Sequence, residues 1–435
     1  MNSIFKKLIG SKETKNAVWI IGGKVAQMIL SFVVSVLTAR YLGPENYGSL
    51  NYVLAFVNFF LTISSLGIGS VIIKFFINEP ELQGETLGTA LVLEIVASLL
   101  SAMMIVGIIA LLDGDEPTTI LIAVLASISL VFQAVEVINR WFQSHYRSKV
   151  SSIATLIAYV VTSAYRLILL ITKKNVVWFA FATTLDHLCI AAVLYCVYRK
   201  SKGPKLYFSA SKAKRLLSQS YHYIFSGMMM ALYNQTDKLF LKHLLDETAV
   251  GHYTLAMQIN TMWVFVLVAI IDSISPTIMQ LHTTDRAAYL KKNRQLYSIV
   301  IYVAAVVAIG LSVLGTPMIR LVYGTEYVPA SAPLKIAVWS VLLSHLSLAR
   351  NVWIVCENKQ KYLKYLYLFS AVLNIPMNLI LIPLLGSSGA ALSSLLTQMM
   401  STVVFPALIP DMRPNIKLMF EALVLKDLWK KKKMG

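Results

Sequence analysis

The chain has 435 residues, of which 57% are hydrophobic and 14% are charged, and its formal net charge is +18. A soluble domain of this length does not need so much apolar surface, so the composition argues against an ordinary globular protein and favours lipid as the solvent. The three cysteines, Cys189, Cys196 and Cys356, lie in apolar segments, and they predict neither a disulfide framework nor a metal site.

Apolar runs long enough to cross a bilayer follow one another along almost the whole chain. Twelve spans are expected, near 17–39, 50–73, 87–112, 118–139, 150–172, 176–198, 219–241, 252–281, 295–318, 333–356, 362–384 and 388–410. The first run is long and has no clear small-residue cleavage site after it, so we expect a retained helix and not a signal peptide. The sequence therefore predicts an all-α integral membrane protein with little extramembrane structure.

The distribution of basic residues predicts the orientation of these spans. If the N-terminus is cytoplasmic, the cytoplasmic segments hold 29 of the 39 Lys and Arg residues and the outer segments hold six. Lys and Arg favour the cytoplasmic side, so both termini are expected there. The positive charge then reflects topology and contact with anionic membrane lipids, and no nucleic-acid partner is expected.

Near the midpoint, the basic segment 199–217 is interpreted as a cytoplasmic linker between two six-helix bundles, 1–198 and 218–410. Leu42 and Gly48 recur as Leu245 and Gly251, 203 positions later. This weak repeat is consistent with bundles related by pseudo-two-fold symmetry, a common transporter plan. The remaining segment, 411–435, is a basic cytoplasmic tail that could form an amphipathic helix on the inner leaflet or stay solvated.

Enzyme signatures are absent from the sequence. It has no Gly-rich phosphate loop followed by Lys and Ser or Thr, and no His-Glu-x-x-His motif. We therefore expect no catalytic residues, no cofactor and no metal site.

Ionisable residues inside the spans are the candidate site residues, because such groups are costly in lipid and normally face a cavity or a partner. Lys24 lies near the middle of the first span and Arg166 lies in the fifth. A cavity lined by these cations suits a polyprenyl-pyrophosphate sugar, since phosphates bind Lys and Arg. Arg350 and Glu136 lie near span ends, where their side chains are expected to snorkel to the interface.

Two acidic positions suggest an ion-coupled cycle. Asp237 lies beside Lys238 in the seventh span, and Asp272 lies in the eighth. Either carboxylate could bind a coupling H⁺ or Na⁺, because buried carboxylates shift their pKa readily. The alternative for Asp237 and Lys238 is an ion pair that fixes helix packing.

The segment Thr38-Ala-Arg-Tyr-Leu-Gly-Pro-Glu-Asn-Tyr-Gly48 resembles the polysaccharide-transport family, the Wzx-like O-antigen and exopolysaccharide flippases. This family belongs to a superfamily, the multidrug/oligosaccharidyl-lipid/polysaccharide exporters, that also contains multidrug extruders and the lipid II flippase. Similar stretches occur at 236–253 and 374–391, so the resemblance covers essentially the whole chain. It implies a MATE-like fold of two six-helix bundles around a central cavity, and a lipid-linked oligosaccharide of the undecaprenyl-pyrophosphate type as cargo. It further implies a location in the bacterial cytoplasmic (inner) membrane. It also implies a functional role for Arg40.

These features together predict a flippase that works by alternating access. The headgroup would bind Lys24, Arg166 and Arg40, with Asp237 and Lys238 also lining the cavity. Gly43, Pro44 and Gly48 are possible hinges, although a tight turn would equally explain them. Glycan polymerase and chain-length proteins are possible partners.

Two other functions stay open. One is an ion-coupled drug/cation antiporter of the same fold, against which Lys24 argues because a cationic drug prefers an acidic cavity. The other is a membrane-bound glycan polymerase or ligase, against which the short outer loops argue.

Overall fold

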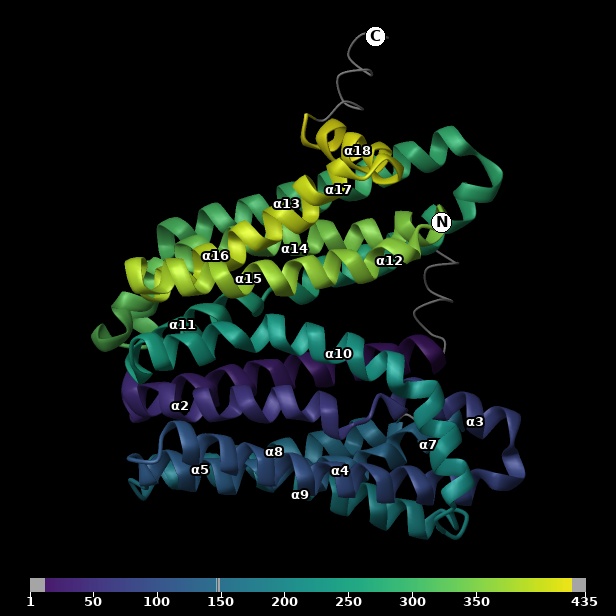
Figure 1. Ribbon diagram of the computed structural model, residues 1–435, viewed down its shortest axis with the longest axis vertical. Coiled ribbons are helices and arrows are strands. Elements are labelled where there is room, and N and C mark those ends of the chain that lie inside the picture. Colours follow the sequence, from purple (N-terminus) through teal and green to yellow (C-terminus); the bar gives the residue numbers. More distant parts are fainter. Residues whose placement is uncertain (1–11, 146, 148, 425–435) are drawn as a thin grey trace. The chain divides into compact units, whose positions relative to one another are not determined.

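The computed structural model describes the backbone of residues 12–145, 147 and 149–424, and the side chains from Leu30 onwards within those ranges. All regular elements in these residues are helices, so the predicted all-α fold is confirmed (Figure 1). The chain divides into two units. The N-terminal unit contains the residues up to Leu42 and Phe60–Ile224, and the C-terminal unit contains Gly43–Phe59 and the residues from Phe225 onwards.

Ten helical segments among the described residues are long and apolar enough to cross a membrane. The first of them, Leu30–Ser64, includes a break in the helix, and another, Glu247–Thr284, combines two helices. The expected boundaries of the two bundles and of the linker stay predictions.

The N-terminal unit is built from long helices joined by short turns. Its elements are α2 (Lys12–Ser64, shared with the other unit), α3 (Ile72–Asn78), α4 (Gln83–Leu112), α5 (Pro117–Ser127), α6 (Ser129–Ala134), α7 (Ile138–Ser144), α8 (Lys149–Ile171), α9 (Val176–Lys200) and the start of α10 (Ala210–Leu244). A core of Phe76, Trp141, Phe142 and Tyr198 joins α3, α7 and α9. Aromatic side chains bury large areas, so they dominate packing here.

Helix α2 contains the first two predicted spans, separated at Gly43 (φ 70°, ψ 170°). Glycine adopts this positive φ without steric strain, and Pro44 can start the next helix. The second predicted span, 50–73, is wrong at its end, because α2 stops at Ser64. Leu66 and Gly67 have positive φ values of 49° and 60°, which interrupt the helix before α3 begins.

In the C-terminal unit, successive helices pack as neighbours around shared apolar cores. The elements are α11 (Glu247–Thr261), α12 (Val264–Thr284), α13 (Arg286–Val322), α14 (Ser331–Cys356), α15 (Leu363–Leu385), α16 (Ser387–Met399), a π-helical turn (Met400–Val404), α17 (Phe405–Leu408) and α18 (Arg413–Leu423). The predicted span 252–281 comprises α11 and α12, which meet at a turn around Trp263.

Two glycines let α2 and α11 cross at backbone contact within the C-terminal unit. A Cβ atom added to Gly48 would lie 1.8 Å from the carbonyl oxygen of Glu247, and one added to Gly251 would lie 2.1 Å from that of Pro44. The two contacts are reciprocal, since Gly251 and Glu247 each follow Gly48 and Pro44 by 203 positions. Gly48 is thus a packing residue within a helix, and the non-helical backbone lies at Gly43.

Helix α18 packs against α13. Its residues Ile416, Leu418 and Met419 are buried, and Asn415 donates a 2.7 Å hydrogen bond from Nδ2 to the hydroxyl of Tyr297. The alternative of a solvated tail is therefore wrong for Arg413–Leu423, because the apolar face of this helix is buried against α13.

The basic segment near the midpoint is anchored within the N-terminal unit. Lys212 is 2% exposed and forms an ion pair with Glu79, which also accepts a 2.6 Å hydrogen bond from Arg215. The hydrogen bonds from Lys212 and Arg215 hold the pKa of the Glu79 carboxyl below its usual value. These contacts fix the start of α10.

Candidate functional site

A buried carboxylate, Asp237, is the centre of a polar cluster in the C-terminal unit. It lies on α10 and is 4% exposed. Tyr253 of α11 and Ser394 of α16 both donate their hydroxyls to Oδ2, the latter at 2.8 Å. Asn378 of α15 donates from Nδ2 to Oδ1 at 2.6 Å. Four helices therefore converge on one carboxyl group.

A second layer of amides and hydroxyls surrounds these contacts. The side chain of Asn378 also donates to Oδ1 of Asn374 at 3.0 Å, and the hydroxyl of Ser393 donates to the backbone carbonyl of Asn374 at 3.4 Å. All three residues are fully buried, and Oδ1 of Asn378 has no hydrogen-bond partner. An unpaired polar atom in such a place is costly, so the cluster retains one unused hydrogen-bond acceptor.

This arrangement can hold a proton or a small hard cation. No salt bridge to Asp237 is found among the described residues, and burial of an unpaired charge is unfavourable. Protonation would remove the charge, and a cation that prefers oxygen ligands would compensate it. The described side chains contain no group of three or more His, Cys, Asp or Glu residues that could hold a metal ion.

The expected alternative, an ion pair between Asp237 and Lys238, is wrong. Within the described part of the chain Lys238 forms no salt bridge, and it is half-buried. Consecutive residues on a helix do not face each other, so the two side chains leave α10 in different directions.

Among the described side chains, none of the other predicted site residues forms a hydrogen bond with Asp237. Asp272 is exposed on α12, in the same unit as Asp237. Arg40 is exposed on α2 and Arg166 is half-buried on α8, both in the N-terminal unit. Lys24 lies on α2, but its side chain is outside the described residues. A cavity formed by these cations thus stays a prediction.

The N-terminal unit contains a polar contact that the sequence analysis missed. Nδ1 of His187 lies 2.8 Å from Oε1 of Glu136, and Nε2 of Gln133 lies 2.7 Å from Nε2 of the same histidine. The side chain of Glu136 thus has a partner within the unit and is 33% exposed, and its snorkelling to the interface stays a prediction. Gln133 and Glu136 are three residues apart and so share a helix face, a spacing that could have indicated a common partner.

The expected snorkelling of Arg350 is wrong. Its side chain is 2% exposed within the C-terminal unit. Nη1 donates to the backbone carbonyl of Thr402 at 3.0 Å, and Nη2 donates to the hydroxyl of Ser347 at 2.7 Å. The π-helical turn at Met400–Val404 supplies this acceptor, and such turns are frequent at functional sites.

Comparison with known families gives two matches. Residues 14–282 match the model described as polysaccharide biosynthesis protein, and residues 223–380 match the MatE model. The first match spans well over half of the chain.

Two curated proteins are similar in sequence. The lipid II flippase MurJ of Bacillus subtilis is 23% identical over 303 residues, which cover 61% of this chain and 55% of that protein. The chain thus matches about half of the length of this relative. The probable flippase AglR of Haloferax volcanii is 26% identical over 411 residues, covering 89% of this chain and 82% of that protein.

Solved structures share the fold. The lipid II flippase MurJ in an inward closed conformation has a TM-score of 0.75 at 14% identity, covering 94% of this chain and 91% of that one. An inward-facing multidrug resistance MATE family transporter has a TM-score of 0.66 at 14% identity, covering 91% and 96%. The predicted MATE-like fold is thus confirmed.

Proposed function

We propose that this chain, which belongs to the polysaccharide biosynthesis protein family, is a flippase for a lipid-linked oligosaccharide. The observation that carries the proposal is the family match over residues 14–282, which includes the segment 38–48. Two curated relatives are named as flippases, and one of them as a flippase of lipid II. The proposed cargo is a polyprenyl-pyrophosphate oligosaccharide of the undecaprenyl type, destined for O-antigen, capsule or exopolysaccharide.

We propose that the cargo moves from the cytoplasmic to the outer face by alternating access. The excess of Lys and Arg in alternate connections supports cytoplasmic termini. Phosphates of the headgroup would bind Lys24, Arg40 and Arg166, because Arg in particular recognises phosphate through paired hydrogen bonds. Arg40 lies three residues before the break at Gly43, where a backbone change would alter its direction.

Asp237 is the proposed coupling residue. It is buried and surrounded by neutral donors, so its charge state depends on whether a proton or Na⁺ is bound. An ion that enters from one side would change the interactions among α10, α11, α15 and α16. Asp272 is a weaker candidate, because its exposed side chain lacks such surroundings.

A reconstituted assay tests this function. The full chain would be placed in liposomes with a fluorescent polyprenyl-pyrophosphate saccharide, and flipping measured by chemical quenching of the outer leaflet. We expect protein-dependent flipping that responds to a H⁺ or Na⁺ gradient in the native chain. Failure to flip this lipid under any gradient would contradict the proposal.

A drug/cation antiporter is the second candidate, favoured by the MatE match over residues 223–380. Efflux assays in a drug-sensitive strain separate the two functions, since an antiporter would lower drug accumulation without any lipid substrate. A deletion strain tests the polymerase or ligase alternative. Unpolymerised lipid-linked units should accumulate on the inner face if the protein is a flippase, and on the outer face if it is an enzyme of that kind.

A further inference from the structure

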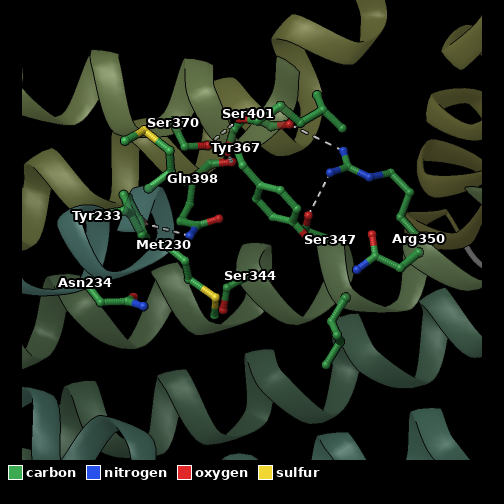
Figure 2. Close-up of a pocket in the computed structure, with 14 residues that line it drawn as sticks. Met230, Tyr233, Asn234, Ser344, Ser347, Arg350, Tyr367, Ser370, Gln398 and Ser401 are labelled. Atoms are coloured by element: carbon green, nitrogen blue, oxygen red, sulfur yellow. Dashed lines mark hydrogen bonds between the residues drawn. The ribbon is translucent and has the colours of Figure 1, made fainter. Parts of the chain in front are cut away.

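A cavity of about 240 Å³ lies within the C-terminal unit, between α10, α14, α15, the end of α16 and the start of the π-helical turn (Figure 2). The residues that line it range from exposed to almost fully buried. Met230 and Tyr367 are 64% and 51% exposed, whereas Arg350 is 2% exposed. The cavity therefore opens to the surface of the unit and has a buried cation in its wall.

The charge of Arg350 has no ionic partner in the described residues. Its three hydrogen bonds go to neutral oxygens, the backbone carbonyls of Ser401 and Thr402 and the hydroxyl of Ser347. Nε is buried and has no acceptor. A buried guanidinium without an anion is unfavourable, so an anionic ligand in the cavity would be bound favourably.

The fold holds this guanidinium in a fixed position. Figure 2 shows two of its three hydrogen bonds, one to the hydroxyl of Ser347 on α14 and one to the backbone carbonyl of Ser401. Because carbonyls of the π-helical turn accept from Nη1, the side chain cannot extend to solvent without the loss of buried hydrogen bonds. Preorganisation of this kind lowers the free energy needed to order a binding group.

The rest of the lining suits a sugar. Tyr233 and Tyr367 offer ring faces, and Asn234, Asn351 and Gln398 offer amides. The amide of Gln398 donates to the hydroxyl of Tyr233 at 2.8 Å, which orients both groups. Ring faces pack on apolar sugar surfaces, and a few fixed polar groups give specificity in an otherwise apolar pocket.

We propose that this cavity binds the sugar-phosphate part of a lipid-linked saccharide, with Arg350 as the phosphate-binding residue and Tyr367 as a sugar-binding residue. The proposal rests on the proposed flippase function and adds a cargo site within the C-terminal unit. The apolar side chains of Met229 and Met230 at the same cavity suit the first part of the lipid chain.

Binding to the purified full-length protein tests the phosphate contact with three probes. They are a short-chain polyprenyl-pyrophosphoryl disaccharide, the same disaccharide lipid without phosphate, and phosphatidylglycerol. Arg350→Gln should raise the Kd of the first probe at least about tenfold, as expected for a lost hydrogen bond to a charged group. The Kd of the phosphate-free lipid should not change. The Kd of Arg350→Lys for the first probe should lie between those of the native protein and Arg350→Gln. Arg320→Gln, at an exposed arginine of α13, is the control and should bind as the native protein does.

Three results would overturn the assignment. Equal weakening of the charged and uncharged saccharide lipids by Arg350→Gln would show a structural role. Unchanged binding of the charged probe would remove Arg350 from the site. Equal affinity for phosphatidylglycerol, with the same dependence on Arg350, would make the cavity a general phospholipid site.

Tyr367→Leu provides a test that leaves the buried arginine in place. It should weaken binding of both saccharide lipids severalfold and leave binding of a polyprenyl pyrophosphate without sugar unchanged; an equal effect on all three would contradict the sugar contact. Flipping assays distinguish a failure of this binding site from a failure of the proposed flippase function. Normal flipping by Arg350→Gln would refute this site alone, whereas absence of flipping by the native chain would refute the proposed function.

Discussion

Replacement of Gly48 by alanine should destabilise the C-terminal unit. The added Cβ would lie 1.8 Å from the carbonyl oxygen of Glu247 and 2.9 Å from the backbone nitrogen of Gly251. Ordinary van der Waals contact begins at 3.4 Å, so α2 and α11 would have to separate by about 1.6 Å. Both obstructing groups belong to helix backbones, which cannot rotate away as the end of a side chain can.

The expected loss follows from two opposing effects. Overpacking in a well-packed core costs about 1–3 kcal/mol, and contact with backbone favours the upper end. Alanine regains about 1 kcal/mol of helix propensity over glycine. The net destabilisation should therefore be about 2 kcal/mol, or a fall in Tm of about 4–8 °C.

Thermal unfolding of the purified protein in detergent measures this effect. Gly310→Ala is the matched control, because a Cβ added at Gly310 on α13 meets nothing within 4 Å. Its Tm should stay the same or rise. A Gly48→Ala variant with the Tm of the control would refute the reasoning. Gly251→Ala should resemble Gly48→Ala, and the double variant should lose less than the sum, because one separation of the helices relieves both contacts.

Three further predictions concern the site, the basic segment and α18. Asp237→Asn should abolish the dependence of flipping on a H⁺ or Na⁺ gradient in liposomes, while a retained gradient response would exclude this carboxylate as the coupling group. Glu79→Gln should flatten the acid side of a Tm-versus-pH curve. The hydrogen bonds from Lys212 and Arg215 lower the pKa of Glu79 in the folded state. Their stabilisation is therefore present above the ordinary pKa of 4.5 and is lost as the pH falls through the lowered value. An unchanged acid limb would contradict this ion pair. Asn415→Ala should cost about 1–3 kcal/mol, because the buried hydroxyl of Tyr297 loses its partner, and an unaltered Tm would refute that contact.

Sequence patterns were sufficient for the parts of this molecule that depend on local chemistry. Apolar runs long enough to cross the hydrocarbon core predicted the helices, because a segment in lipid must satisfy its backbone hydrogen bonds internally. The positive φ at Gly43 falls in the segment 38–48 that indicated a turn. Asp237 was a candidate because an acid within an apolar span needs an unusual environment.

The environments of individual side chains were harder to predict. Arg350 and Glu136 lie near span ends, where snorkelling is the usual outcome, yet one binds carbonyls about fifty residues away and the other contacts His187 on another helix. Sequence spacing says little about such partners. The adjacent residues Asp237 and Lys238 show the converse, because proximity in the sequence did not produce contact.

The sequence by itself determined that this chain is a helical membrane protein of the exporter type, because hydrophobic length, charge bias and the segment 38–48 are properties of short stretches. The tertiary structure alone decided which polar groups meet. Asp237 gains its donors from three other helices, and Gly48 meets the backbone of Glu247. These contacts depend on how helices distant in sequence pack together, and hydropathy carries no information about which faces come into contact.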